Sequence, residues 1–344
     1  MLLSHPNIDI DYKDLSGVTA LWAACQNNNS EVVELLLHPR NVVVELQTDH
    51  KGHRRVASVT NKKHEFDPSK IGIGAMFPPE DGDHRQRHND DDDEESDISD
   101  LDELDHDRRR KKGRSQRKKR SEKRQGANPN LAKHDGCTPL WIAASRGNSQ
   151  CMEPLINYGA DLNKPDRSQG ATPLFVACQN GKKPAVDLLL AANADVNRPR
   201  SGDGTTPLMM AAHNGHSGIV DVLLKSGADP MQANTTGLNA LGCAAMQGHS
   251  EIVKLAYQHL LNVKNPQEIV DFVNAGDGVN GWTPLHLACM GGHENVIKYL
   301  INVVKVDIFK KDYENKTGLE HAWQNGHQTI VSWLSQLEAS YSRL

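Results

Sequence analysis

The chain of 344 residues is 37% hydrophobic, has a mean hydropathy of -0.60 and carries a formal net charge of -5. This hydrophobic content is low for a chain that packs along its whole length, so part of it is expected not to fold. No stretch approaches the ~20 apolar residues of a membrane span, and residues 1–10 lack the basic and long apolar parts of a secretory signal. The six cysteines show no Cys-x-x-Cys spacing. They are expected to be reduced and structural, as in a cytoplasmic or nuclear protein.

The N-terminal segment, residues 1–52, contains one copy of a motif that returns later in the chain. The copy reads GVTALWAACQNNN from Gly17. The sequence LLSHPNI at 2–8 also resembles LLHPRNV at 36–42, which indicates that the chain starts at the tail of a repeat. Two explanations stay open: these residues form a minimal cap, or upstream repeats are missing from this sequence.

Residues 53–125 interrupt this pattern and are predicted to be a disordered insertion. Its residues 89–107 hold twelve Asp or Glu and no Lys or Arg, and residues 108–124 hold twelve Lys or Arg and one Glu. Blocks of like charge at this density are solvated and do not form a packed core. The apolar run at 71–79 is either a linear peptide motif or a short strand against the rest of the protein.

The basic block resembles a bipartite nuclear-import signal, with its two clusters at Arg109, Arg110, Lys111, Lys112, Arg117, Lys118, Lys119 and Arg120. Contact with RNA or DNA phosphates and a merely solvated linker are the alternatives. No aromatic residue is interleaved for base stacking, which argues against sequence-specific nucleic-acid recognition. Ser96 and Ser99 lie among carboxylates and are candidates for phosphorylation, with an unmodified spacer as the alternative. We also hypothesise that the acidic run masks the basic one.

From residue 126 to residue 344 one motif recurs in phase. Its copies read GCTPLWIAASRGN from Gly136, GATPLFVACQNGK from Gly170, GTTPLMMAAHNGH from Gly204, GLNALGCAAMQGH from Gly237, GWTPLHLACMGGH from Gly281 and KTGLEHAWQNGH from Lys316. The starts of the first four copies are separated by 34, 34 and 33 residues. This resembles the ankyrin repeat, with a period of ~33 residues and a T-P-L-H-x-A signature. The resemblance implies an all-α solenoid of helix-turn-helix repeats with short β-like fingers, here interrupted by the insertion.

The residue types in the motif agree with that fold. Each threonine can cap a helix N-terminus, and the proline after it suits the first helical position. Glycines such as Gly147 and Gly215 fall where the first helix must reverse, and a second amphipathic helix follows them. One such unit cannot bury its apolar face alone, so the repeats must stack.

Two copies depart from the period. The step from Gly237 to Gly281 is 44 residues, which predicts an extended repeat at 237–280 with a longer second helix (251–262) and an extra short helix capped by Asn265. The last copy has Gly318 in place of proline and no finger after it, as expected of a C-terminal capping repeat.

Catalytic and metal sites are not expected. No HExxH, paired CxxC, Gly-x-Ser-x-Gly or Walker motif occurs. His216, His249, His293 and His327 recur once per copy, and the resemblance implies that they hydrogen-bond backbone across the turn. We therefore predict no enzyme activity, no cofactor, no metal and no small-molecule substrate.

The predicted function is that of a non-catalytic protein-interaction scaffold, cytoplasmic or nuclear, that binds a partner through the concave surface of the solenoid. Trp141, Phe175 and Met209 occupy the usual histidine position and are expected to pack between neighbouring repeats. The partner-facing residues lie after the paired small residues of the first helices or in the fingers. They are Arg146, Gln179, Asn180, His213, Asn214, Met246, Gln247, Met290, Gln324, Lys164, Arg167, Arg198 and Arg200, with Asn234 and Thr235 beside them.

The alternative is a nuclear factor whose insertion engages histones through the acidic run or nucleic acid through the basic run. An import receptor is an expected partner of the basic block, and nucleic acid is expected to bind only non-specifically. No membrane association is predicted.

Overall fold

The computed structural model describes residues 10–38, 42–48, 54–61, 64–66 and 126–341. The chain divides into two compact units, one formed by residues 1–24 with 29–128 and the other by residues 25–28 with 129–344. The predicted import-signal residues, Ser96, Ser99, the apolar run at 71–79 and the first nine residues lie outside the described residues.

The first unit contains the N-terminal copy of the motif and a small sheet. Helices α1 (Ala20–Gln26) and α2 (Ser30–Leu37) form the two helices of the repeat. After α2 come strands β1 (Val42–Thr48), β2 (Arg54–Asn61) and β3 (His64–Phe66). They pair antiparallel in the order β1-β2-β3, with Val42 opposite Asn61 and an irregularity between Glu45 and Leu46.

The strands correct the prediction for this region. The second repeat helix ends at Leu37, and β2 and β3 lie in the first part of residues 53–125, which were predicted to be a disordered insertion. The physical reason is local composition, because VVVELQT and RRVASVTN are rich in β-branched residues, which favour a pleated strand.

The repeat resumes directly after the insertion. The backbone N–H of Ala127 donates to the carbonyl of Leu36 at 2.8 Å, and that of Asn128 donates to Asp11 Oδ1 at 2.9 Å. Ala160 N–H makes the equivalent bond to Leu155 at 3.0 Å in the next repeat. The insertion therefore lies inside one repeat, between its second helix and the finger that follows.

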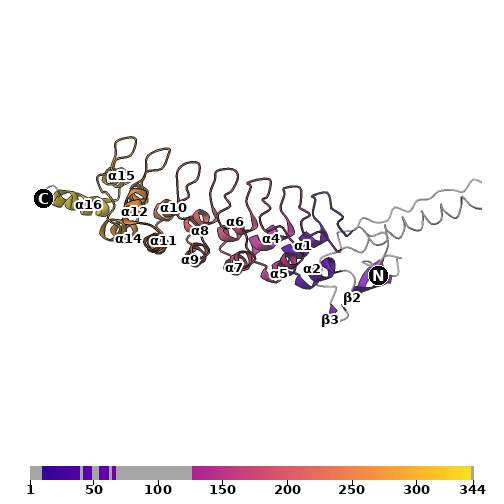
Figure 1. Ribbon diagram of the computed structural model, residues 1–344. Coiled ribbons are helices and arrows are strands. Elements are labelled where there is room, and N and C mark those ends of the chain that lie inside the picture. The colour runs from indigo at the N-terminus through magenta and orange to yellow at the C-terminus, as the bar shows by residue number, and fades with distance from the viewer. Residues whose placement is uncertain (1–9, 39–41, 49–53, 62–63, 67–125, 342–344) are drawn as a thin grey trace, which may run out of the picture. The chain divides into compact units, whose positions relative to one another are not determined.

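The second unit is a run of helix pairs. Figure 1 shows these pairs following one another in chain order, with the finger loops between them projecting to the same side. The helices are α4 (Pro139–Arg146), α5 (Ser149–Asn157), α6 (Pro173–Gln179), α7 (Lys183–Ala191), α8 (Pro207–His213), α9 (Ser217–Lys225), α10 (Ala240–Gln247), α11 (Ser250–Val263), α12 (Pro266–Val273), α13 (Pro284–Gly291), α14 (Glu294–Tyr299), the π-helical turn η5 (Leu300–Val304), α15 (Gly318–Gln324) and α16 (Gln328–Tyr341).

Two helical layers run along this unit. The first helices of successive repeats (α4, α6, α8, α10, α13 and α15) contact one another, and so do the second helices from α5 to α14. Leucines at the third motif position, such as Leu140, Leu174 and Leu208, are at most 2% exposed. Burying one leucine contributes about 1.5–3 kcal/mol, so these layers hold the array together.

The predicted caps and turns are confirmed. Thr138, Thr172, Thr206 and Thr283 accept a backbone N–H three residues ahead at 3.1–3.4 Å, and each is followed by proline at the start of its helix. Gly147 and Gly215 reverse the chain at a φ of 78°, a conformation that L side chains rarely adopt. The predicted longer second helix and the extra short helix after it are also confirmed, because α11 runs to Val263 and Asn265 caps α12.

All six cysteines are free and buried. Burial raises the pKa of Cys151 to about 11 and that of Cys289 to about 12. These thiols are therefore protonated at neutral pH and pack as small apolar side chains.

Candidate protein-binding surface

A continuous row of residues runs along the second unit at the ends of the first helices and is called here the first-helix row. Each repeat contributes either the last two residues of its first helix or the last residue and its cap. Asn180 donates from Nδ2 to the carbonyl of Ser145 at 3.0 Å, and Asn214 donates to the carbonyl of Gln179 at 2.9 Å. Each of these amides reaches back to the preceding repeat. The row comprises Ser145, Arg146, Gln179, Asn180, His213, Asn214, Met246, Gln247, Met290 and Gly291.

The recurring histidines hold the first-helix row in place by bonds to the preceding repeat. Nε2 of His216, His249, His293 and His327 lies 2.9–3.3 Å from the carbonyls of Gln179, His213, Met246 and Met290, respectively. The acceptor belongs to the preceding repeat, so the expectation of a bond across the histidine's own turn is wrong. The physical reason is that the last carbonyls of a helix have no partner inside the helix. The imidazole N–H satisfies one of them and joins two repeats.

Two residues at the usual histidine position make a second type of link. Trp141 donates from Nε1 to the carbonyl of Ala171 at 3.0 Å, and His286 Nε2 lies 3.2 Å from the carbonyl of Lys316. Phe175 and Met209 hold the same position with 0% and 1% exposure. These side chains are part of the stack, as expected for packing between neighbouring repeats.

The tips of successive fingers form a second row, called here the fingertip row. It includes Arg167, Thr235, Gly278 and Tyr313. The N–H groups of Arg167, Thr235, Gly278 and Tyr313 donate to carbonyls in the preceding finger, at Asp135, Asp203, Thr236 and Asn280, over 2.7–2.9 Å. The finger bases are linked in the same way, because Asn130, Asn163 and Asn197 accept the N–H of Asp161, Asp195 and Asp229 at 2.7–2.9 Å. Both rows are therefore held by repeated hydrogen bonds between neighbours.

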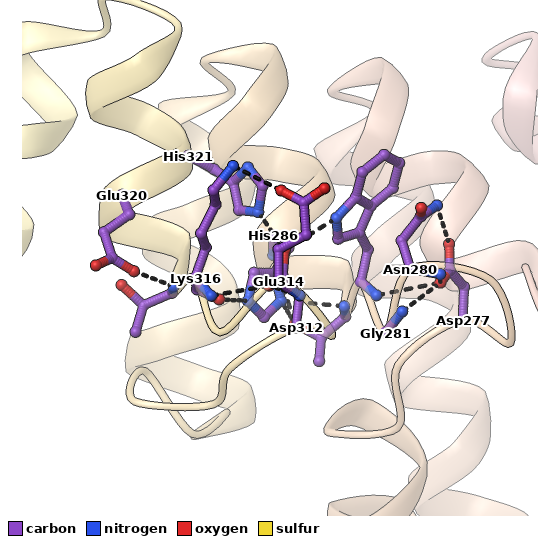
Figure 2. A network of polar contacts seen from close by, with 12 residues as sticks. Asp277, Asn280, Gly281, His286, Asp312, Glu314, Lys316, Glu320 and His321 are labelled. Carbon is purple, nitrogen blue, oxygen red and sulfur yellow. Dashed lines mark hydrogen bonds and ion pairs between the residues drawn. The ribbon is translucent and has the colours of Figure 1, made fainter.

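The fingers near the C-terminus carry an additional buried network, drawn in Figure 2. Asp312 accepts the N–H groups of Glu314 and Lys316 at 3.0 and 2.8 Å. Its Oδ2 also accepts the indole N–H of Trp282 at 3.2 Å and lies 2.7 Å from Nε2 of His321. One carboxylate thus ties together two neighbouring fingers and helix α15.

Electrostatics in this network follow from burial. Burial raises the pKa of Asp312, but the hydrogen bonds from Lys316 and His321 outweigh it, so that the net pKa is below its ordinary value. Burial lowers the pKa of His286, which favours the neutral imidazole.

Among the described residues, no group of three or more His, Cys, Asp or Glu is arranged to hold a metal ion. Within the same residues, no helix is long and apolar enough to cross a membrane.

Several predicted partner-facing residues have polar atoms that are already used within the array. Besides Asn180 and Asn214, Lys164 donates from Nζ to the carbonyl of Asn130 at 3.0 Å. Arg200 pairs with Asp203, whose pKa is lowered by the hydrogen bond from this guanidinium. Its guanidinium carbon also lies 5.4 Å from the centre of the Phe175 ring. These residues shape the surface, and their contact with a partner stays a prediction.

The structure places the other predicted residues along the two rows or at the end of the array. Arg146, Gln247, Gln324, Arg167 and Arg198 are exposed, and Gln179, His213, Met246 and Met290 are half-buried. No ion pair or side-chain hydrogen bond engages Arg146, Arg167 or Arg198 within the described residues. They are exposed cations available to a partner, as are Lys310 and Lys311 in the last finger.

Sequence reasoning missed exposed apolar residues near the C-terminal end of the unit. Val279 and Tyr313, in successive fingertips, are 59% and 72% exposed, and Trp323 on α15 is 65% exposed. The sequence does contain a signal for these positions. Each fingertip shortly precedes the glycine that starts a copy of the motif, or the asparagine that replaces this glycine in the last copy.

Family comparisons agree with this geometry. The family described as "Ankyrin repeats (3 copies)" matches residues 121–200, 199–267 and 258–343, and "Ankyrin repeat" matches residues 16–48. The chain belongs to the ankyrin-repeat family.

Similar proteins match only in part. Protein phosphatase 1 regulatory subunit 27 of Mus musculus is 34% identical over 68 residues, which cover 20% of this chain and 37% of that protein. The Homo sapiens protein of the same name matches to the same extent. Putative glutaminase 2 of Caenorhabditis elegans is 41% identical over 54 residues, which cover 16% of this chain and 9% of that protein. The chain thus spans 37% or less of the length of these relatives.

Proposed function

We propose that this protein is a non-catalytic scaffold that binds a protein partner through the first-helix row and the fingertip row. The observation that carries the proposal is the pair of continuous rows, which neighbouring repeats hold in place by hydrogen bonds. Such a preorganised surface binds without ordering its own backbone, which lowers the entropic cost of association.

The comparisons support this proposal at the level of class. Ankyrin-repeat membership and similarity to a protein named as a phosphatase regulatory subunit both favour an interaction role. The match to a putative glutaminase covers only 9% of that protein, so it gives no support for amidase chemistry. Residence in the cytoplasm, the nucleus or both belongs to the proposal.

Site-specific photo-crosslinking tests the proposed surface. A photo-reactive amino acid at Gln247, an exposed residue of the first-helix row, is compared with one at Gln258, an exposed residue of α11 in the second layer. We expect a discrete protein adduct from Gln247 and none from Gln258 in cell extract. Adducts at both sites or only at Gln258 would contradict the proposed surface.

A second candidate function rests on the charge blocks at 89–107 and 108–124, which lie outside the described residues. In this proposal the insertion binds histones or nucleic acid, and the basic block also binds an import receptor. Binding to nucleic acid through phosphates falls steeply with salt. The test is a salt titration of nucleic-acid binding by the full chain and by a chain with Ser in place of Lys and Arg from 108 to 124. The comparison would separate binding by the insertion from binding by the array.

A further inference from the structure

One member of the fingertip row is not bonded to the preceding finger through its backbone. Ser201 lies over Gly170, where a Cβ atom would come within 2.4 Å of Ser201 Oγ and 2.8 Å of its backbone N. Arg167 lies over Gly136 in the same way, but its N–H donates to the carbonyl of Asp135 at 2.7 Å. Among the described residues, no hydrogen bond engages the N–H of Ser201. The finger between α7 and α8 (Figure 1) therefore has a tip that lacks this backbone link.

The hydroxyl of Ser201 also differs from those of the neighbouring fingertips. The residue is exposed, and within the part of the chain that the structure describes its Oγ makes no hydrogen bond. Ser168 is exposed as well, but its Oγ donates to the buried Asp166. Thr236 donates from Oγ1 to Asn234 Oδ1 at 2.7 Å. Ser201 therefore offers a hydroxyl that can react without loss of a hydrogen bond in the described array.

The tip that contains this hydroxyl, residues 198–204, carries two arginines. Arg198 stands three residues before Ser201 and is exposed, and Arg200 stands directly before it. The Arg200 side chain is oriented by Asp203, whose Oδ1 accepts its Nε–H at 3.0 Å. No ion pair or side-chain hydrogen bond involves Arg198 within the described residues. Basophilic protein kinases select serines that follow such cations, because carboxylates of the kinase pair with them.

The tip can enter a kinase cleft without disturbing the core. Two backbone hydrogen bonds close it, from the N–H of Arg200 to Thr205 at 2.8 Å and from the N–H of Gly204 to Arg200 at 3.0 Å. Beyond the hydroxyl, the carbonyl of Asp203 accepts the N–H of Thr235 at 2.9 Å. No residue of this tip is buried, and loops with few buried contacts are the segments that open locally. Opening the tip therefore uncovers no apolar core.

We infer that Ser201 is a phosphorylation site of a basophilic serine kinase. Ser201 Oγ attacks the γ-phosphorus of ATP, and the new O–P bond forms as the bond between this phosphorus and the β–γ bridging oxygen breaks. ADP leaves, and the hydroxyl proton passes to the catalytic aspartate of the kinase. Two observations carry the inference, namely the hydroxyl without a hydrogen bond in the described array and the exposed Arg198 three residues before it. The modification itself does not depend on the proposed function.

The phosphate reverses the charge of the tip. Residues 198–204 carry two arginines and one aspartate, which sum to a net charge of +1. A phosphate adds about −1.5 to −2 charges at pH 7, so the modified tip is negative. The fingertip row then repels acidic groups that Arg198 attracts in the unmodified chain. Phosphorylation therefore regulates the surface by charge, and this consequence, unlike the modification, rests on the proposed function.

The test incubates the full chain with Mg²⁺, ATP and the active catalytic subunit of cyclic-AMP-dependent protein kinase, a basophilic kinase. Peptide mapping by mass spectrometry gives the phosphate occupancy of each serine and threonine separately. This resolution is needed because Ser115 and Ser121 in the basic block also follow Lys and Arg. The variants are Ser201→Ala and Arg198→Gln. Arg146→Gln, which changes an exposed arginine on α4, is the matched control.

We expect phosphate on Ser201 of the unmodified chain. The initial rate at this serine should be about tenfold lower in the Arg198→Gln chain, because one charge-assisted contact with the kinase is lost. The Arg146→Gln chain should be phosphorylated on Ser201 like the unmodified chain. Ser168 should stay unmodified, because its hydroxyl is bonded within its finger. Thr235 should also stay unmodified, because no Lys or Arg stands within the eight residues before it.

Absence of phosphate on Ser201 would overturn the inference, and so would an unchanged rate in the Arg198→Gln chain. Phosphorylation of Ser168 or Thr235 as fast as that of Ser201 would also contradict it, because exposure alone would then decide.

Crosslinking at Gln247 separates these failures from failure of the proposed function. Phosphate on Ser201 without a Gln247 adduct means that the site stands and the scaffold function is wrong, and an adduct without phosphate means the reverse. Where both form, the adduct yield should differ between the kinase-treated chain and the Ser201→Ala chain treated in the same way. Equal yields would show that the charge of this tip does not regulate the surface.

Discussion

Nε2 of His321 lies 2.7 Å from Oδ2 of Asp312, and both residues are at most 6% exposed. His321 belongs to α15 and Asp312 to the finger before it, so the contact closes the C-terminal repeat on itself (Figure 2). The same carboxylate receives the indole N–H of Trp282 from the preceding finger. The last repeat is therefore joined to its neighbour through one buried acid.

Replacing Asp312 with Ala should lower the free energy of unfolding of the C-terminal repeats by about 1–3 kcal/mol, because it leaves buried donors without an acceptor. Urea denaturation measures the loss. Asp307→Ala is the control, since Asp307 is exposed and, among the described residues, its carboxylate accepts the N–H of Phe309 alone. Because coupling in a repeat array runs between neighbours, hydrogen exchange should rise in α13 and α15 and stay unchanged in α4. An equal rise in all repeats would contradict this.

The stability of the array should depend on pH through His286. Its pKa is lowered by burial, so the unfolded chain binds the proton more readily than the folded one. The stabilisation is therefore present above the unfolded pKa of about 6.5 and lost progressively as the pH falls below it. The lowered pKa of Asp312 acts in a separate window, because its contribution is lost only below about pH 3.9.

His286→Met is the variant that tests this dependence, because Met209 occupies the same motif position with 1% exposure. Subtracting its unfolding free energies from those of the unmodified chain cancels the histidines that do not contact position 286, whereas the ring of His321 lies 5.6 Å from that of His286 and stays coupled to the substitution. The difference should shrink as the pH falls from about 7 to about 5. A difference that is constant over this range would show that His286 is not the titrating group.

Gly248 and Gly326 offer a matched pair for separating backbone strain from contact between repeats. Both have a φ of 78°, but a Cβ atom at Gly248 would come within 2.4 Å of His293 Nδ1, whereas nothing lies within 4 Å at Gly326. Substitution by Ala should cost about 1–2 kcal/mol at Gly326 from left-handed backbone alone. We expect a clearly larger loss at Gly248, measured by denaturation. Equal losses would mean that His293 moves aside freely.

The histidine link between repeats can be tested at His293. Replacing it with Ala leaves the carbonyl of Met246 without its donor and should cost about 1–3 kcal/mol. His293→Asn should recover part of this, because Asn148 holds the equivalent position and donates to the carbonyl of Cys25 at 2.8 Å. His259→Ala, on α11 and outside the link, is the control. Failure of Asn to exceed Ala in stability would argue that ring packing, and not the hydrogen bond, is what matters.

Local sequence determined much of this protein. The Thr-Pro pairs predict where first helices begin, because the cap and the proline act within one helical turn. Residues such as Gly147 and Asn193 predict the reversals, since their left-handed backbone is a property of the single residue. The extra helix after Asn265 follows from the same local rules.

The contacts between repeats were decided by tertiary structure. A histidine in the turn is compatible with a bond inside its own repeat or to the preceding one, and only stacking brings His293 within 2.9 Å of Met246. Likewise, Asp312 and Trp282 lie 30 residues apart and meet only because two fingers pack side by side. The sequence alone therefore determined the repeat and its register, because caps and turns depend on residues a few positions apart. The first-helix row and the fingertip row depended on the tertiary structure, because stacking sets which side chains bond to a neighbouring repeat and which stay exposed.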